Sequence, residues 1–163
     1  MIIFLRHAEP RSTELDPGLT SAGVRMAREA AEWAVAQLPA DRPVTVPVLH
    51  TATRRTAQTA AAVVEWLGEA AQLQEVERLP HSIGDIDILA HKLSSSQPGL
   101  PPRPRLHAVL VGHHTTLVGL RRELADRTPA HLLPSPSNYA AGLVLAVEDT
   151  RWVIQAAWPG RRS

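Results

Sequence analysis

Two short hydrophobic runs in this chain each lead into a histidine. Residues 2–5 are all apolar and are followed by Arg6 and His7, and residues 109–112 (Val-Leu-Val-Gly) lead directly into His113. Runs of this length and composition are typical of the buried strands of a parallel sheet. Ligands of open α/β sheets bind in the crevice outside the carboxyl ends of the strands. We therefore expect the two histidines to meet across one pocket.

Strand-like and helix-like segments alternate around these runs, as they do in layered α/β proteins. The pattern predicts strands at residues 2–5, 44–50, 73–76 and 106–111, a terminal hairpin of residues 142–147 and 152–157, and helices at residues 20–38, 54–67, 86–93 and 115–125. Pro43 and Pro47 predict an edge position or an irregular start for the second strand. Glu148 and Asp149 are expected to form the hairpin turn. The Ser- and Pro-rich residues 94–105 predict an exposed connector. The fold class that follows is a three-layer α/β/α arrangement with a mostly parallel central sheet.

The size and charge of the chain narrow the classes of protein to which it can belong. Its 163 residues suit one domain over residues 1–163. Lys and Arg number 17 against 16 Asp and Glu, so the net charge of +1 provides no general attraction to nucleic acid or to a membrane surface. The chain has no cysteine, which excludes disulfides, thiolate catalysis and Cys-based zinc sites. Without a signal peptide or an apolar stretch of membrane length, we expect a cytoplasmic protein with no nucleic-acid or membrane partner. The oligomeric state stays open.

Four short motifs follow one another along the chain. They are residues 6–9 (Arg-His-Ala-Glu), residues 51–60 (Thr-Ala-Thr-Arg-Arg-Thr-Ala-Gln-Thr-Ala), residues 112–113 (Gly-His) and residues 137–140 (Ser-Asn-Tyr-Ala). In this order and at these intervals they resemble the histidine phosphatase, or phosphoglycerate mutase-like, superfamily. Within the second motif Arg55, Gln58 and Thr59 match the family pattern, whereas Thr51, Ala52 and Thr56 depart from it. The short stretch between residues 60 and 106 is most similar to the compact bacterial phosphohistidine phosphatase-like subgroup. The resemblance implies a phosphoglycerate mutase-like fold.

These residue types suit phosphoryl transfer on physical grounds as well. A transferring phosphoryl group needs fixed positive donors around its oxygens, and Arg6, Arg55 and His113 can supply them. A neutral imidazole at His7 can attack phosphorus through one nitrogen while the other donates to a carbonyl. The resemblance implies the same role for His7, with a phosphohistidine intermediate that water hydrolyses and with no metal or cofactor. The substrate is then a phosphorylated small molecule or a phosphoprotein.

Two further residues are expected to contribute to substrate binding. Glu9 either touches substrate or pairs with an arginine, and His114 either lines the pocket or caps a helix. Glu9 is the last residue of the motif that carries His7, and His114 directly follows the motif that carries His113.

The proton donor to the leaving group is the point at which the chain departs from the family pattern. Relatives commonly carry Leu-x-Glu after the third strand, whereas this chain carries Leu79-Pro80-His81. Protonated histidine titrates near neutrality, so His81 is the leading candidate for the general acid. Other candidates remain, and they are Glu77, Asp85, Asp87 and His114. A phosphohistidine substrate has a good leaving group and needs less protonation.

Other functions are compatible with parts of this pattern. The principal alternative is a catalytically weak phospho-ligand binding module that keeps the phosphate pocket but lacks the usual acid. A phosphoglycerate-type mutase is a second alternative, which the absence of long insertions disfavours. A metal hydrolase is disfavoured because the eight histidines show no His-Glu-x-x-His element or other close ligand spacing.

Overall fold

The computed structural model describes residues 1–12, 16–40, 45–95, 107–133, 135 and 137–162. Its strands are β1 (Ile2–Arg6), β2 (Val46–His50), β3 (Ala71–Glu75), β4 (Ala108–Gly112), β5 (Gly142–Glu148) and β6 (Arg151–Trp158). Its α-helices are α1 (Ser21–Gln37), α2 (Arg54–Leu67), α3 (Ile83–Ser95) and α4 (His114–Leu124), and short 3-10 helices η1 (Gly68–Ala70), η2 (Ala125–Arg127) and η3 (Ala130–Leu132) follow some of them. Each predicted strand and helix is present. The connector predicted for residues 94–105 lies mostly outside the described residues, and α3 continues through its first two positions.

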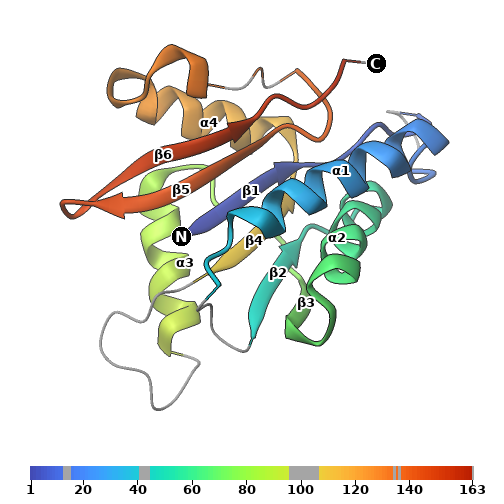
Figure 1. Ribbon diagram of the computed structural model, residues 1–163, viewed down its shortest axis with the longest axis horizontal. Helices are drawn as coiled ribbons and strands as arrows, with labels where there is room; N and C mark the ends of the chain where they lie inside the picture. The colour runs from blue at the N-terminus through green and yellow to red at the C-terminus, as the bar shows by residue number, and fades with distance from the viewer. Residues whose placement is uncertain (13–15, 41–44, 96–106, 134, 136, 163) are drawn as a thin grey trace.

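The six strands form one sheet in the order β3-β2-β4-β1-β5-β6. The first four in this order run parallel, and β5 and β6 pair antiparallel at one side. Helices α1 and α2 lie on one face of the sheet and α3 and α4 on the other, as Figure 1 shows. The prediction of a three-layer α/β/α fold with a mostly parallel sheet is therefore confirmed.

Strand β1 supplies both halves of the core because its side chains alternate between the faces. Ile3 and Leu5 pack with the alanines of α1 and α2, whereas Ile2 and Phe4 pack with leucines of α4. All four side chains are fully buried. A strand buried on both faces needs apolar residues at every position, which explains the unbroken apolar run at the start of the sequence.

Capping residues mark the start of α1 and the end of α2 close to the predicted positions. The Thr20 side chain accepts a hydrogen bond of 2.8 Å from the Gly23 N–H and caps α1, and Gly68 ends α2 with a φ of 60°. Such caps satisfy backbone groups that have no partner within the helix. None of the described helices is both long enough and apolar enough to span a membrane.

The structure excludes one of the two possibilities predicted for the second strand, and it contradicts the predicted hairpin turn. Strand β2 is not an edge strand, because it pairs with β3 on one side and with β4 on the other. Its pairing with β4 begins only at Val48, which agrees with the irregular start that was the other possibility. Pro47 lies before this pairing, so its missing N–H removes no hydrogen bond to β4. Pro43 lies outside the described residues. The hairpin turn consists of Asp149 and Thr150, both at positive φ, and Glu148 is still part of β5.

Candidate active site

The site lies at the carboxyl ends of the parallel strands, where β1 and β4 are neighbours. Arg6 of β1 pairs with Gly112 of β4, so the residues after them, His7 and His113, leave the sheet side by side. Their ring centroids are 5.2 Å apart in an edge-on arrangement, and the His7 N–H donates to the Gly112 carbonyl at 2.8 Å. The parallel register thus brings together two histidines that are more than a hundred positions apart in the chain.

His7 is held as a neutral imidazole with a defined tautomer. Its Nδ1 lies 2.8 Å from the Ala8 carbonyl oxygen, which can only accept, so Nδ1 carries the hydrogen and Nε2 keeps its lone pair. Burial above all, together with the charges of His113, Arg6 and Arg55, lowers the pKa of His7 to about 3, although the Ala8 hydrogen bond acts to raise it. At neutral pH the ring is uncharged and its Nε2 is available as a nucleophile.

Arg6 and Arg55 bring two guanidinium groups to the same place. Arg6 is 9% exposed, and its Nη1 donates to the Ser137 carbonyl. Burial lowers the pKa of Arg6, an effect to which the charge of Arg55 adds. The Nε of Arg55 is buried and has no hydrogen-bond partner within the described residues. Two arginines this close repel each other unless an anion lies between them, so the pair indicates an anion site.

The start of α2 contributes to the charge of the same site. Arg54 and Arg55 are its first residues, and their backbone N–H groups donate to the carboxylate of Asp16, at 3.3 Å in the case of Arg55. Thr53 occupies the N-cap position without capping through its side chain. Asp16 thus takes the place of a side-chain cap and sets a negative charge against the positive end of the helix dipole.

A chain of threonine hydroxyls holds His113. The Nε2 of His113 lies 3.2 Å from the Thr51 hydroxyl, which in turn lies 3.3 Å from the Thr56 hydroxyl. Thr56 is fully buried and donates to the carbonyls of the residues before it. Burial lowers the pKa of His113, and the charge of Arg55 lowers it further. Thr51 and Thr56, which depart from the family pattern, therefore orient the second histidine.

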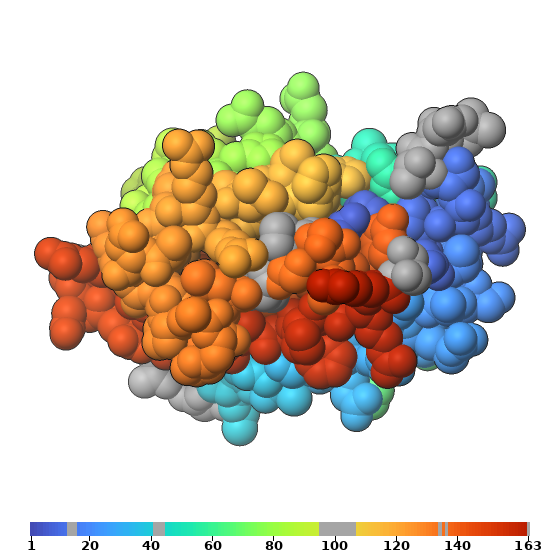
Figure 2. Space-filling model, turned by 90° about the horizontal axis from the view of Figure 1, so that it is seen from above, coloured from blue at the N-terminus to red at the C-terminus, as the bar shows by residue number. Residues whose placement is uncertain are grey.

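A cleft of about 400 Å³ joins these groups, a volume large enough for a phosphoryl group and part of its substrate. It is lined by Arg6, His7, Pro10, Arg55, His113, His114, Thr115 and Tyr139. Figure 2 shows the start of the chain, in dark blue, reaching this surface between the gold residues that follow β4 and the orange residues before β5. The structure therefore places five of the predicted site residues around one cleft: Arg6, His7, Arg55, His113 and His114.

Two predicted site residues do not line the cleft. The Glu9 carboxylate accepts a hydrogen bond of 2.7 Å from the Thr20 hydroxyl and so ties the loop after β1 to the start of α1. His81 lies on the loop before α3, where its Nδ1 is 3.5 Å from the Thr116 hydroxyl of α4.

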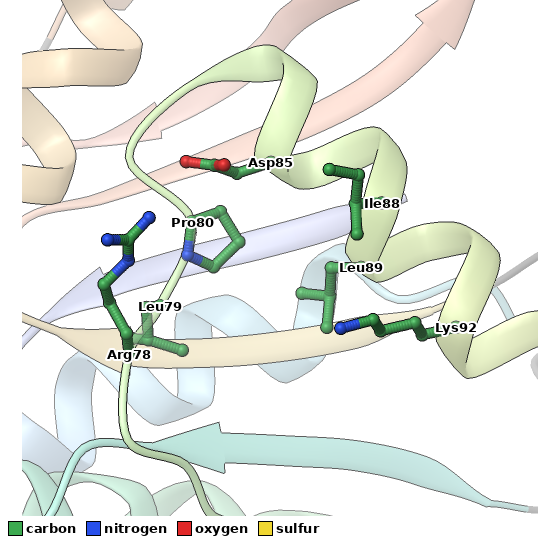
Figure 3. A pocket seen from close by; sticks show the side chains of 7 residues that line it. All are labelled: Arg78, Leu79, Pro80, Asp85, Ile88, Leu89 and Lys92. Carbon is green, nitrogen blue, oxygen red and sulfur yellow. The ribbon is translucent and has the colours of Figure 1, made fainter.

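The other candidate acids lie on or near α3. Asp87 accepts a hydrogen bond of 2.6 Å from the indole N–H of Trp152, and Asp85 accepts one from the His81 backbone N–H. Asp85 lines a separate cavity, which Figure 3 shows between α3 and the strand-to-helix loop, with Arg78 across from it and Ile88 and Lys92 along its side. Glu77 does not line the cleft either. Across the described ranges, no three His, Cys, Asp or Glu side chains cluster closely enough to hold a metal ion.

Residues that belong to this site but were not predicted from the sequence include Asp16, Thr51 as a partner of His113, and Tyr139. The Arg6 guanidinium lies over the Tyr139 ring, with its Cζ 4.3 Å from the ring centroid. A signal existed for Thr51, because it directly follows the carboxyl end of β2. Asp16 and Tyr139 lie in loops, and no local pattern indicates what they contact.

The structure resembles solved phosphatases and mutases over nearly its whole length. It is similar to SixA of Agrobacterium tumefaciens, a candidate phosphohistidine phosphatase (22% identity, 96% of this chain and 95% of the other, TM-score 0.62). It is also similar to the mycobacterial glucosyl-3-phosphoglycerate phosphatase Rv2419c, solved with VO3 (19% identity, 98% of this chain and 98% of the other, TM-score 0.63). A third similar structure is a phosphoglycerate mutase of Bacillus anthracis (11% identity, 95% of this chain and 91% of the other, TM-score 0.65). No protein-family model and no curated protein matches the sequence. These likenesses confirm the predicted phosphoglycerate mutase-like fold.

Proposed function

We propose that this chain, which has the fold of the histidine phosphatase superfamily, is a metal-independent phosphatase that forms a phosphohistidine on His7. The observation that carries the proposal is the convergence of two arginines and two histidines on one cleft, with the Nε2 of the buried, neutral His7 free to react. The solved phosphatases of the same fold support it. The substrate is a phosphomonoester or a phosphohistidine.

The reaction proceeds in two displacements at phosphorus. The Nε2 lone pair of His7 attacks the phosphorus, the bond to the leaving oxygen or nitrogen breaks, and the leaving group departs with that electron pair. Water then attacks the phosphohistidine, which releases inorganic phosphate and restores the imidazole. Arg6 and Arg55 neutralise the charge on the non-bridging oxygens, while His113 provides a further donor beside His7.

His114 is our choice for the residue that protonates the leaving group. Of the five candidate acids, all of which lie in the described part of the chain, it alone lines the cleft. It is the first residue of α4 and its side chain is exposed, so a substrate can reach it. The sequence favours His81, which acts in this arrangement only if the loop before α3 moves toward the cleft.

A phospho-ligand binding module is the second candidate function. Among the described residues, those that line the cleft include no carboxylate, which is the group that relatives commonly use as the acid. Such a module keeps the phosphate pocket and turns over slowly or not at all. Hydrolysis of p-nitrophenyl phosphate, whose leaving group needs little protonation, separates this function from the first.

The proposal is tested by trapping the phosphoenzyme. Wild type is mixed with radiolabelled phosphoramidate and quenched in alkali, where phosphohistidine survives, and the labelled residue is mapped. We expect label on His7, no label in His7→Ala, and hydrolysis that falls about 10³-fold or more in that variant. The exposed His131→Ala serves as the control and is expected to keep both label and activity. Label that persists in His7→Ala shows that the nucleophile is wrong. Phosphate binding without label or hydrolysis favours the binding module.

A further inference from the structure

Tyr139 borders the cleft and is in contact with two of its main groups. The Arg6 guanidinium lies over its ring at 4.3 Å, and the centroid of the ring is 5.9 Å from that of His7. A cation over the face of an aromatic ring is attracted to it, more strongly where water is excluded. The neighbouring Ser137 carbonyl accepts a hydrogen bond from Arg6 as well. The segment of residues 137–141 therefore orients Arg6 from two sides.

The same segment is also tied to the backbone that carries the nucleophile. The Ala140 N–H donates to the His7 carbonyl at 3.2 Å, and the Arg6 N–H donates to the Ala141 carbonyl at 2.8 Å. Ala140 is buried and has a φ of 55°, a conformation that is unfavourable for a non-glycine residue and persists only where the surroundings enforce it. Something outside the segment must therefore hold it in this shape.

Residues 159–161, which we call the strap, provide that hold. Tyr139 and Arg161 exchange two backbone hydrogen bonds, of 2.8 and 2.9 Å, and the Asn138 side chain donates to the Pro159 carbonyl at 2.8 Å. The Arg161 guanidinium forms an ion pair with Glu29 of α1 at 2.9 Å, which anchors the strap to a helix. The strap thus links α1, on one side of the molecule, to the segment that covers Arg6.

Gly160 makes the close approach of the strap possible. Its φ is 65°, and a Cβ at this position would lie 2.4 Å from the Tyr139 carbonyl oxygen and 2.6 Å from the Ala141 nitrogen. Both contacts are with backbone atoms, which cannot move aside as a flexible side chain can. A side chain here must therefore push the strap away from Tyr139.

We propose that Tyr139 is a positioning residue for Arg6, and that the strap sets its place and thereby sets how tightly the cleft binds a phosphoryl group. Tyr139 acts through Arg6 and needs no direct part in the chemistry. The aromatic ring provides the surface on which the guanidinium rests, and the Tyr139 hydroxyl adds a side-chain hydrogen bond to Arg6, so the tyrosine holds Arg6 in two ways. This inference rests on the proposed function only in assigning the anion in the cleft as phosphate.

The first test displaces the strap and observes Tyr139, which is the only tyrosine of the chain. Incorporation of 3-fluorotyrosine therefore gives one ¹⁹F resonance, which we expect to shift on titration with inorganic phosphate. Gly160→Ala is expected to move this resonance and to weaken phosphate binding about tenfold. Gly68→Ala is the matched control, because Gly68 also has positive φ but a Cβ there meets nothing within 4 Å. It is expected to lose stability while keeping wild-type phosphate affinity.

The second test changes the ring and leaves the strap intact. Tyr139→Phe keeps the aromatic face but loses the hydroxyl bond to Arg6, and it is expected to bind phosphate about threefold more weakly than wild type. Tyr139→Leu loses both the ring and the hydroxyl and is expected to bind phosphate about tenfold more weakly. With p-nitrophenyl phosphate, Tyr139→Leu is expected to raise KM more than it lowers kcat, because the nucleophile is unchanged. Asn138→Ala, which removes one tie to the strap, offers a milder variant if Gly160→Ala does not fold.

The outcomes separate this inference from the proposed function. The inference is overturned if Tyr139→Leu and the strap variant, either Gly160→Ala or Asn138→Ala, bind phosphate as tightly as wild type does. It is also overturned if Tyr139→Phe and Tyr139→Leu lose phosphate affinity equally. A ¹⁹F resonance that does not respond to bound phosphate overturns it as well. A different result separates the two proposals. If the phosphate affinities follow the expected order but the protein neither hydrolyses substrate nor labels His7, the inference is supported and the proposed catalytic function is rejected.

Discussion

Among single residues, His7 couples the chemistry of the cleft to the stability of the fold. Its pKa is lowered to about 3 from an ordinary value of 6.5, so between these values the unfolded state binds a proton that the folded state excludes. The stability that depends on a neutral His7 is therefore fully present above pH 6.5 and is lost as the pH falls toward 3. The slope for one such group is at most about 1.4 kcal/mol per pH unit.

Replacing His7 with glutamine removes this titration. We expect the free energy of unfolding of His7→Gln to depend less on pH than that of wild type between about pH 7 and about pH 4. Urea unfolding followed by circular dichroism at several pH values in that window measures the slopes. His131→Gln removes an exposed histidine and is expected to keep the wild-type slope. Parallel curves for wild type and His7→Gln would show that burial of His7 does not set the acid sensitivity.

Among the elements, α2 has the most direct effect on the charge of the cleft. Its first N–H groups are occupied by the carboxylate of Asp16, and the same carboxylate raises the pKa of His113 against the larger lowering by burial and by Arg55. Asp16 thus stabilises the helix and at the same time offsets part of the positive potential that a phosphoryl group would meet.

Asp16→Asn is expected to change stability and affinity in opposite directions. The amide keeps an acceptor for the helix but loses the charge, so unfolding should become easier by about 0.5 to 1 kcal/mol. Phosphate should bind several-fold more tightly, since the competing anion is gone. Isothermal titration with phosphate and urea unfolding provide the two values. Glu148→Gln, an exposed carboxylate in the terminal hairpin, is the control and should change neither. Unchanged or weaker phosphate binding in Asp16→Asn contradicts this role.

For the molecule as a whole, the central position of β1 argues that residues 1–163 unfold as one domain. Adjacent residues of this strand, Phe4 and Leu5, belong to the cores on opposite faces of the sheet. Neither face can lose its packing without loss of the strand that both share.

We therefore expect Phe4→Ala and Leu5→Ala each to lower the free energy of unfolding by about 2 to 5 kcal/mol and to shift one common transition. Tryptophan fluorescence and far-ultraviolet circular dichroism should report the same midpoint in every variant. The control is Val147→Ala, because Val147 is 55% exposed on β5, and it should change stability by less than about 1 kcal/mol. A transition seen by one probe and not by the other would show that the two faces unfold separately.

The sequence predicts best those features that depend on neighbours in the chain. The ends of α1 and α2 follow from Thr20 and Gly68, whose effects are local. Of the edge position and the irregular start predicted from Pro43 and Pro47, the edge position is wrong, because strand order is a property of the whole sheet and no residue of β2 encodes its two neighbours. The sequence could not predict the partner of Glu9 either, since an arginine and the Thr20 hydroxyl are both suitable partners for a carboxylate.

The pattern of apolar runs was sufficient to predict the layered fold, because burial leaves a regular signal in a sequence. The short motifs at the ends of these runs and at the start of the second helix were sufficient to nominate His7, His113, Arg6 and Arg55. Tertiary structure alone decided how these groups are held. The contacts of Arg6 with Tyr139, of His113 with Thr51 and of α2 with Asp16 join residues far apart in the chain. Such contacts depend on the distances that packing creates, which no local pattern carries.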